Sequence, residues 1–138
     1  MLLPAPVQRD LVVSACAISA GIHGALVREH LDESAGAGYG FVAATVLLAS
    51  LVVVLACRPA SRAAAWAAVV VLGGLLAGYA LAVATGVPLL HPEREQVDGL
   101  ALATKAVEAV GLLAALLSIG RGRAAVGSGV IRTKGVQQ

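Results

Sequence analysis

Apolar residues form four long runs in this chain, and short polar segments separate them. The runs cover residues 11–28, 39–57, 63–86 and 99–119. About 20 apolar residues allow an α-helix to cross the ~30 Å hydrocarbon core of a membrane. Runs of this length favour spanning helices over buried strands. The pattern therefore predicts an all-α fold, an integral membrane four-helix bundle.

The polar segments predict how these helices are joined. Residues 1–10 form a short head, and residues 120–138 form a glycine-rich, basic tail that we expect to be disordered. The segment Arg58-Pro59-Ala60-Ser61-Arg62 predicts a tight turn, because proline ends a helix. Residues 29–38 and 87–98 form the other two connections, and both are acidic.

The basic residues predict the orientation. The head, the proline-containing turn and the tail hold Arg9, Arg58, Arg62, Arg121, Arg123, Arg132 and Lys134, whereas the other two connections hold Arg28 and Arg94. By the positive-inside rule, both termini are cytoplasmic. We therefore expect a multi-pass protein of the plasma membrane, with its acidic connections outside. The frequent Ala, Gly, Val and Arg are typical of a high-GC bacterium.

Composition narrows the function classes. Hydrophobic residues make up 59% of the chain and charged residues 13%, whereas soluble domains have about 25% charged residues. The net charge of +2 is too weak to predict nucleic-acid binding. We find no Gly-rich phosphate loop, Gly-x-Ser-x-Gly or Cys-x-x-Cys, which disfavours soluble-type hydrolases and nucleotide enzymes. We interpret Cys16 and Cys57 as packing residues.

Two charged residues interrupt the last apolar run. Lys105 and Glu108 lie well inside it, where an unpaired charge costs at least ~2.5–3.5 kcal/mol. Side chains three residues apart on a helix can pair. We therefore expect Lys105 and Glu108 to form an ion pair that faces the interior of the bundle.

Each of the other three helices offers a polar group at a similar depth. Counted by helix rise from the outer surface, His23, Thr45 and Tyr79 fall at the level of Lys105 and Glu108. These five residues predict a polar ligand pocket that opens to the outer face. Two alternatives are open: a buried ion pair that fixes helix register, with His23 bonded to it, and a proton or ion path.

A second polar group would form the mouth of this pocket. Its nitrogen and oxygen donors suit a divalent transition metal, and an acidic, solvated rim is the alternative. The group comprises His30, Glu33, His91, Glu93, Glu95 and Asp98. His23 and His30 lie ~10 Å apart on a helix, too far to share one ion without a bend. Haem is disfavoured, because the last helix has no histidine opposite His23 and aromatic residues are few.

Several short motifs carry a resemblance to a known group of proteins. They are Gly21-Ile-His23, His30-x-x-Glu33, Gly38-Tyr-Gly-Phe41, Thr85-Gly-Val-Pro-Leu89, Pro92-Glu-x-Glu-x-Val-Asp98 and Lys105-x-x-Glu108. Across residues 19–117 the chain resembles a family of small four-pass membrane proteins of actinobacteria and related bacteria, which has no assigned activity. The resemblance implies the four-helix topology and the grouping of these polar positions, and it implies no mechanism.

The function that we predict is non-enzymatic. A small plasma-membrane protein would handle or sense a small ligand or metal ion in a pocket that faces the extracytoplasmic side. One alternative is an accessory or assembly subunit of a larger membrane complex, or a homo-oligomer, because small residues recur on two helices. These residues are Ala17, Gly21 and Ala25, and Gly73, Gly74 and Gly78. Another alternative is a proton or ion transporter that uses Glu108. A membrane enzyme is the least supported.

Overall fold

The computed structural model describes residues 3–85 and 97–132, with side chains as far as Arg121. This part of the chain forms four α-helices and no strand: α1 (Ala5–Glu33), α2 (Ala35–Cys57), α3 (Arg62–Thr85) and α4 (Gly99–Arg132). Each helix contains a segment long and apolar enough to cross a membrane, which in α4 is Gly99–Arg121. The all-α prediction with four candidate spans is therefore confirmed.

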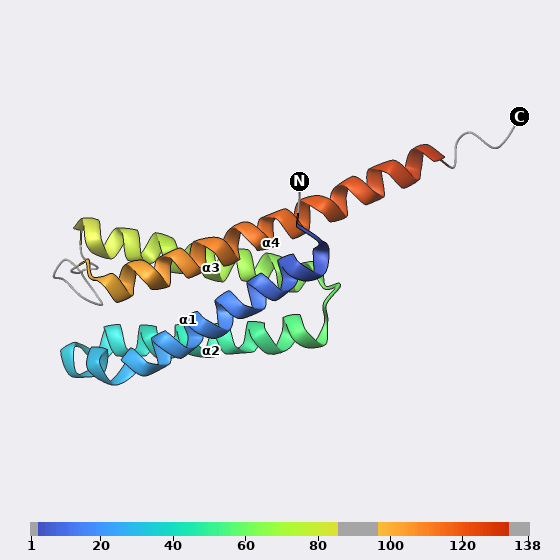
Figure 1. Ribbon diagram of the computed structural model, residues 1–138. Helices are drawn as coiled ribbons and strands as arrows, with labels where there is room; N and C mark the ends of the chain where they lie inside the picture. The colour runs from blue at the N-terminus through green and yellow to red at the C-terminus, as the bar shows by residue number, and fades with distance from the viewer. Residues whose placement is uncertain (1–2, 86–96, 133–138) are drawn as a thin grey trace, which may run out of the picture.

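The four helices run alternately up and down (Figure 1). Helix α1 packs against α2 and α4, and α3 packs against α4 and, less extensively, α2. Consecutive helices are therefore neighbours around the bundle, as short connections favour. The bundle has two chemically different ends. We call the end that holds Arg9, Arg58, Arg62 and Arg121 the arginine end, and the end that holds Glu29, Asp32, Glu33 and Asp98 the acidic end.

Helix α1 is longer than the sequence predicted at both ends. It begins at Ala5 in the expected head, with Pro6 in the first turn, where a missing N–H costs no helical hydrogen bond. It continues to Glu33, through the first half of the expected acidic connection. Only Ser34 separates α1 from α2, in an extended conformation, and its hydroxyl accepts a hydrogen bond from the Ala37 N–H at 3.1 Å.

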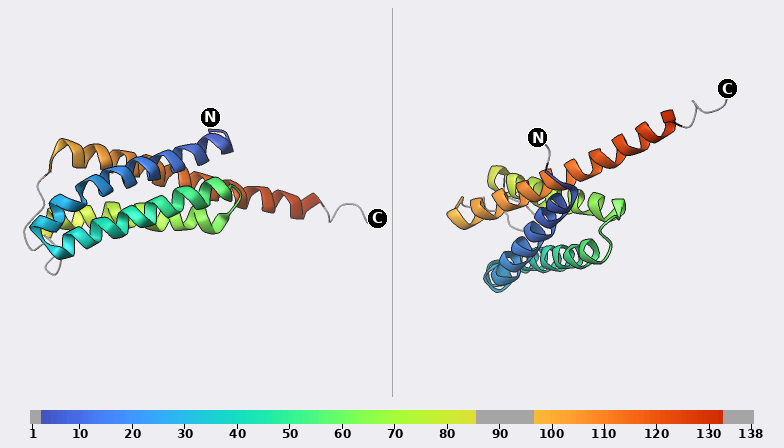
Figure 2. Two further views of the ribbon diagram at one scale, coloured as in Figure 1. Left: turned by 90° about the horizontal axis from the view of Figure 1, so that it is seen from below. Right: turned by 45° about the vertical axis from the view of Figure 1, so that its right-hand side comes forward.

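Helix α4 also continues further than expected. Residues 120–132 are helical where we expected the start of a disordered tail (Figure 2). No proline interrupts this stretch, and adding residues to an existing helix is much easier than starting a new one. As a result, α4 projects beyond the other three helices at the arginine end.

The interior at mid-height is apolar and closely packed. Cys16, Leu48, Leu72 and Ala115, one residue from each helix, are fully buried in one hydrophobic cluster. Many large apolar side chains elsewhere are exposed on the outside of the bundle, including Val46, Val70 and Leu113. An apolar exterior around a small core is typical of helices that face lipid.

Candidate functional site

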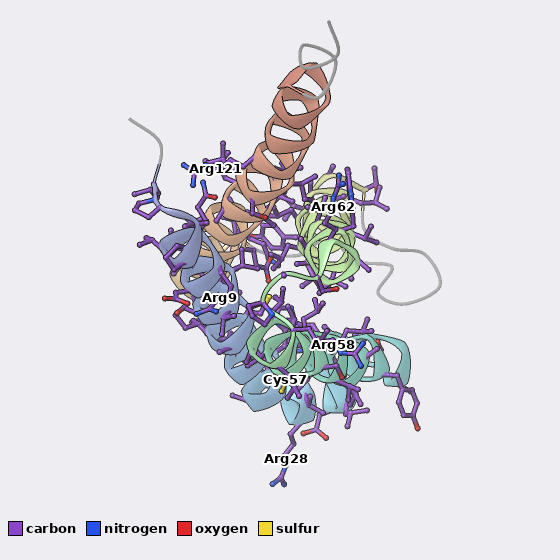
Figure 3. The ribbon with its side chains drawn as sticks, turned by 90° about the vertical axis from the view of Figure 1, so that its right-hand side faces the viewer. Arg9, Arg28, Cys57, Arg58, Arg62 and Arg121 are labelled. Atoms are coloured by element: carbon purple, nitrogen blue, oxygen red, sulfur yellow. The ribbon has the colours of Figure 1, made fainter. Side chains whose placement is uncertain are left out.

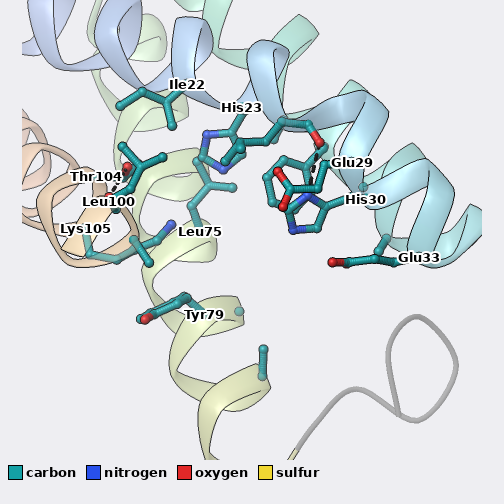
Figure 4. Close-up of a pocket in the computed structure, with 18 of the residues that line it drawn as sticks. Ile22, His23, Glu29, His30, Glu33, Leu75, Tyr79, Leu100, Thr104 and Lys105 are labelled. Carbon is teal, nitrogen blue, oxygen red and sulfur yellow. Dashed lines mark hydrogen bonds between the residues drawn. The ribbon is translucent and has the colours of Figure 1, made fainter. Parts of the chain in front are cut away.

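A cavity of about 570 Å³ lies between the four helices towards the acidic end. Figure 4 shows His23 and His30 from α1, Tyr79 from α3 and Lys105 from α4 around it. Its walls are mainly apolar, with a limited number of polar groups. The polar side chains that line it are His23, Glu29, His30, Glu33, Tyr79, Asp98, Thr104 and Lys105. This composition is typical of small-molecule sites in proteins.

The predicted ion pair forms the inner end of this polar region. The Lys105 ammonium lies 2.7 Å from Oε2 of Glu108, and the Glu108 side chain is fully buried behind it. The same ammonium lies 5.3 Å from the centre of the Tyr79 ring, within the range of a cation–π interaction. Lys105 therefore stands between a buried carboxylate and the cavity, and its charge is largely neutralised.

Sequence reasoning missed Ser19, which completes the surroundings of Glu108. The Ser19 hydroxyl donates a hydrogen bond of 2.7 Å to Oε1 of Glu108, so both carboxylate oxygens have a partner. Serine in an apolar helix often bonds only to its own backbone and gives no signal by itself. Its position four residues before His23, on the same face of α1, was the available clue.

The two histidines present the same nitrogen to the cavity. The Nδ1 atom of His23 lies 2.9 Å from the Ser19 carbonyl oxygen, and that of His30 lies 3.0 Å from the Leu26 carbonyl oxygen. A carbonyl oxygen only accepts, so each Nδ1 carries a proton and donates it to that carbonyl. Each ring is thereby fixed by its own helix, with Nε2 left to contact a ligand.

Helix α2 contributes an aromatic ring where we predicted a hydroxyl. The Phe41 ring stacks on His30 with a centroid distance of 3.7 Å and lies 5.1 Å from His23. The predicted pocket residue Thr45 does not line the cavity. Its hydroxyl donates to the Phe41 carbonyl at 2.8 Å, and its methyl group faces Gly24 on α1. Counting residues from the membrane surface predicts the depth of Thr45, but it does not predict the side of α2 on which Thr45 lies.

The predicted metal-binding mouth is only partly within the described residues. His30, Glu33 and Asp98 line the cavity, whereas His91, Glu93 and Glu95 lie outside the described residues. In residues 3–85 and 97–121, no three His, Cys, Asp or Glu side chains are close enough to hold one metal ion. The metal site therefore stays a prediction.

The geometry around Ser19 differs from that of a hydrolytic triad. In a triad, a histidine lone pair accepts the serine proton. Here Ser19 donates its proton to Glu108, and the His23 nitrogen that faces it, 3.3 Å from Oγ, is itself protonated. The Tyr79 hydroxyl is buried and makes no hydrogen bond with the described residues. Its oxygen atom is occluded by the surrounding protein.

The fold and the cavity together define a small multi-pass helical protein with a mainly apolar cavity, bordered by a few polar groups, towards one end of its bundle. Comparisons with protein-family models, curated proteins and solved structures find no match to this chain.

Proposed function

We propose that this chain is a non-enzymatic, multi-pass protein of the bacterial plasma membrane that binds a small ligand in the cavity between its helices. The arginine end lies in the cytoplasm, and the acidic end faces outward. The charge distribution supports this orientation, because all four arginines of the arginine end flank membrane spans. The cavity then opens towards the extracytoplasmic side.

The observation that carries this proposal is the set of polar atoms without a partner in the cavity. The Tyr79 hydroxyl and Nε2 of His23 and His30 have no hydrogen-bond partner among the described residues. The two Nε2 atoms are not among the occluded polar atoms, so a bound molecule can reach them.

The lining indicates which ligand chemistry fits. Phe41, Leu75 and other apolar side chains form most of the wall, and Lys105 is neutralised by Glu108. The carboxylates that line the cavity lie at the acidic end of the bundle: Glu29, Glu33 and Asp98. These features favour a small amphipathic molecule with a cationic or hydrogen-bonding group over an anion.

A transition metal ion is the other ligand that fits this proposal. A histidine whose Nδ1–H is bonded to a carbonyl oxygen, with Nε2 free to coordinate, is the usual arrangement of metal-binding histidines. The rings of His23 and His30 both contact Phe41, so they lie in one part of the cavity. We therefore expect any metal to involve His30 and a carboxylate of the acidic end.

The experiment is to purify the protein in a mild detergent and measure bound molecules by native mass spectrometry and metals by elemental analysis. Tyr79→Phe and His23→Ala alter the cavity, and Ser50→Ala removes an exposed hydroxyl of α2 as a matched control. We expect a bound molecule or metal in the native chain and the control, with lower occupancy in both cavity variants. Equal content in all four folded proteins would reject the proposal.

One observation favours a second candidate, a subunit of an assembly. Ala17, Gly21 and Ala25 form an exposed row on α1, and no atom lies within 4 Å of where a Gly21 side chain would begin. Such rows let another membrane helix approach closely. Gly74 and Gly78 of α3 support it less, because they line the cavity. A second copy of the chain or another membrane protein would cover the row on α1.

The structure offers less support for a transporter that uses Glu108. Towards the arginine end, the next layer of the described interior is the fully buried apolar cluster with Cys16, Leu48, Leu72 and Ala115. A proton or ion would find no polar group to bond to in that layer. The polar region around Glu108 is therefore closed on that side.

A further inference from the structure

A second cavity, of about 230 Å³, lies at the arginine end of the bundle. The start of α1, the α2–α3 turn and the Arg121 region of α4 surround it, and Figure 3 shows Arg9, Arg62 and Arg121 on three separate helices at this end. Its polar lining residues are Gln8, Arg9, Ser61, Arg62, Ser118 and Arg121. This cavity is separate from the proposed ligand site and shares no residue with it.

Gln8 gives the strongest indication that this cavity has an occupant. Its side chain is fully buried, and neither Oε1 nor Nε2 forms a hydrogen bond with any described residue. Buried side-chain amides are nearly always hydrogen-bonded, so an exception calls for a missing partner. Gln8 is one of the residues that line the cavity, and its amide N–H groups are donors that an anion can accept from.

The charges around Gln8 indicate that the missing partner is an anion. Arg9 is paired with Asp10 at 2.8 Å, and Asp10 is the only acid of the described residues at this end. Arg62 and Arg121 form no ion pair with any described residue. Two uncompensated guanidinium groups therefore border the cavity that holds the buried amide.

The backbone adds to this positive character. Helix α3 begins at Arg62, and the Ser61 hydroxyl accepts a hydrogen bond from the Ala64 N–H at 3.2 Å. The first turn of α3 therefore borders the cavity, and the positive end of the helix dipole favours an anion there. Arginine forks and helix N-termini are both common partners of phosphate groups.

The position of the cavity indicates where a phosphate would come from. Trp66 lies one turn after Arg62 and is 42% exposed, as expected of a side chain at the membrane interface. The cavity therefore lies at the level of the lipid headgroups. Val12, Leu55 and Ile119 form its apolar inner part and belong to the buried core of the bundle. The headgroup would fill the polar part of the cavity between the arginines.

We propose that this cavity binds a phosphate group, supplied by an anionic phospholipid of the cytoplasmic leaflet. The guanidinium groups of Arg62 and Arg121 bind the phosphate oxygens, and Nε2 of Gln8 donates a hydrogen bond from the inside. Basic pockets between helices on the cytoplasmic side are suited to anionic headgroups. A bound lipid would hold α1, α3 and α4 together at this end.

The test measures binding to the full chain purified in a non-ionic detergent. Three probes are compared: dioctanoyl phosphatidylglycerol, dioctanoyl phosphatidylcholine and inorganic phosphate. We expect saturable binding of phosphatidylglycerol, with about tenfold weaker binding for Arg62→Gln or Arg121→Gln, because each loses a charge-assisted contact. Arg58→Gln is the matched control, since this exposed arginine at the same end does not line the cavity.

The other measurements show whether the phosphate group comes from a lipid or from a soluble anion. Equal affinity for inorganic phosphate would support the phosphate site and assign it to a soluble anion. Gln8→Leu should fold at least as stably as the native chain, because it removes a buried amide that has no hydrogen-bond partner. It should also lose phosphatidylglycerol binding, because it removes the hydrogen-bond donor to the phosphate. Equal binding of phosphatidylcholine, or an equal effect of Arg58→Gln and the two cavity variants, would overturn the proposal.

Discussion

Glu108 shows how a carboxylate can be buried between apolar helices. Lys105 bonds to one of its oxygens and Ser19 to the other, so the charge is compensated and both acceptors are used. Such a group is stable only with its partners present, because a buried ion without its counter-ion is far more costly than an apolar replacement of the pair. The stability of the bundle should therefore depend on how the pair is altered.

We predict that Lys105→Met destabilises the protein by about 3–5 kcal/mol, because it leaves the Glu108 charge buried without a cation. The double variant Lys105→Met/Glu108→Gln should recover most of this loss, since the amide is neutral and can still accept from Ser19. Denaturant titration in detergent micelles gives both free energies of unfolding. Arg28→Met, at an exposed position of α1, is the control. A double variant as unstable as Lys105→Met would contradict this account.

The sequence predicted the residues of the polar region better than their surroundings. The i, i+3 spacing of Lys105 and Glu108 predicted their ion pair, which is confirmed. The place of Thr45 was wrong and that of Phe41 was not foreseen. Both errors have one cause: α2 is apolar on nearly every side, so its sequence indicates no inward face. Side-chain direction on such a helix is decided by packing against its neighbours.

At the scale of elements, small residues decide how closely α1 and α4 pack. A side-chain carbon added at Gly111 would lie 2.6 Å from Cβ of Ala15 and 3.1 Å from Cδ1 of Leu72. The contact with Ala15 is closer than real side-chain carbons come, and the contact with Leu72 is tight, so the present crossing of α4 over α1 favours glycine here. Close approach between small residues is a main source of helix association in lipid.

We predict that Gly111→Ala destabilises the bundle by about 1–3 kcal/mol, because α1, α3 and α4 must move apart to admit the methyl group. Ala15→Gly in the same chain should restore part of the loss, since it removes the nearest carbon. Gly73→Ala on α3 is the control, because nothing lies within 4 Å of the added carbon. Thermal unfolding in detergent measures all three. If Gly111→Ala unfolds like the control, the close crossing is not required.

The number and type of the helices could be predicted from the sequence, but their ends could not. Apolar runs show where a helix crosses the membrane, and four such runs gave four helices. The extra turns of α1 at residues 29–33 are acidic, and those of α4 at residues 120–132 are rich in glycine and arginine. A hydropathy pattern predicts connections at such polar residues, although they can continue an existing helix into water.

At the scale of the whole molecule, the two ends differ in charge and each holds its own cavity. The acidic end holds the larger one, with His30, Glu33 and Asp98, and the arginine end holds the smaller one, with Gln8, Arg62 and Arg121. If the arginine end is cytoplasmic, the two proposed sites face opposite sides of the membrane. The orientation therefore determines which molecules can reach each site.

Cys57 allows a direct test of this orientation. It is the last residue of α2, next to Arg58, and it is exposed, whereas Cys16 is fully buried. We predict that a membrane-impermeant maleimide labels the native chain in inverted membrane vesicles and leaves it unlabelled in right-side-out vesicles. Cys57→Ser should abolish the labelling, which would confirm that Cys16 is inaccessible.

The matched variant Cys57→Ser/Glu33→Cys moves the thiol to an exposed position at the acidic end. It should show the reverse pattern, with labelling in right-side-out vesicles, because in the proposed orientation the acidic end faces outward. Labelling of native Cys57 in right-side-out vesicles would show that the orientation is the opposite of the one proposed. The carboxylate-bordered cavity would then open to the cytoplasm, and the arginine cavity would meet lipids of the other leaflet. Comparing the two variants therefore tests the direction from which a ligand can approach, independently of what the ligand is.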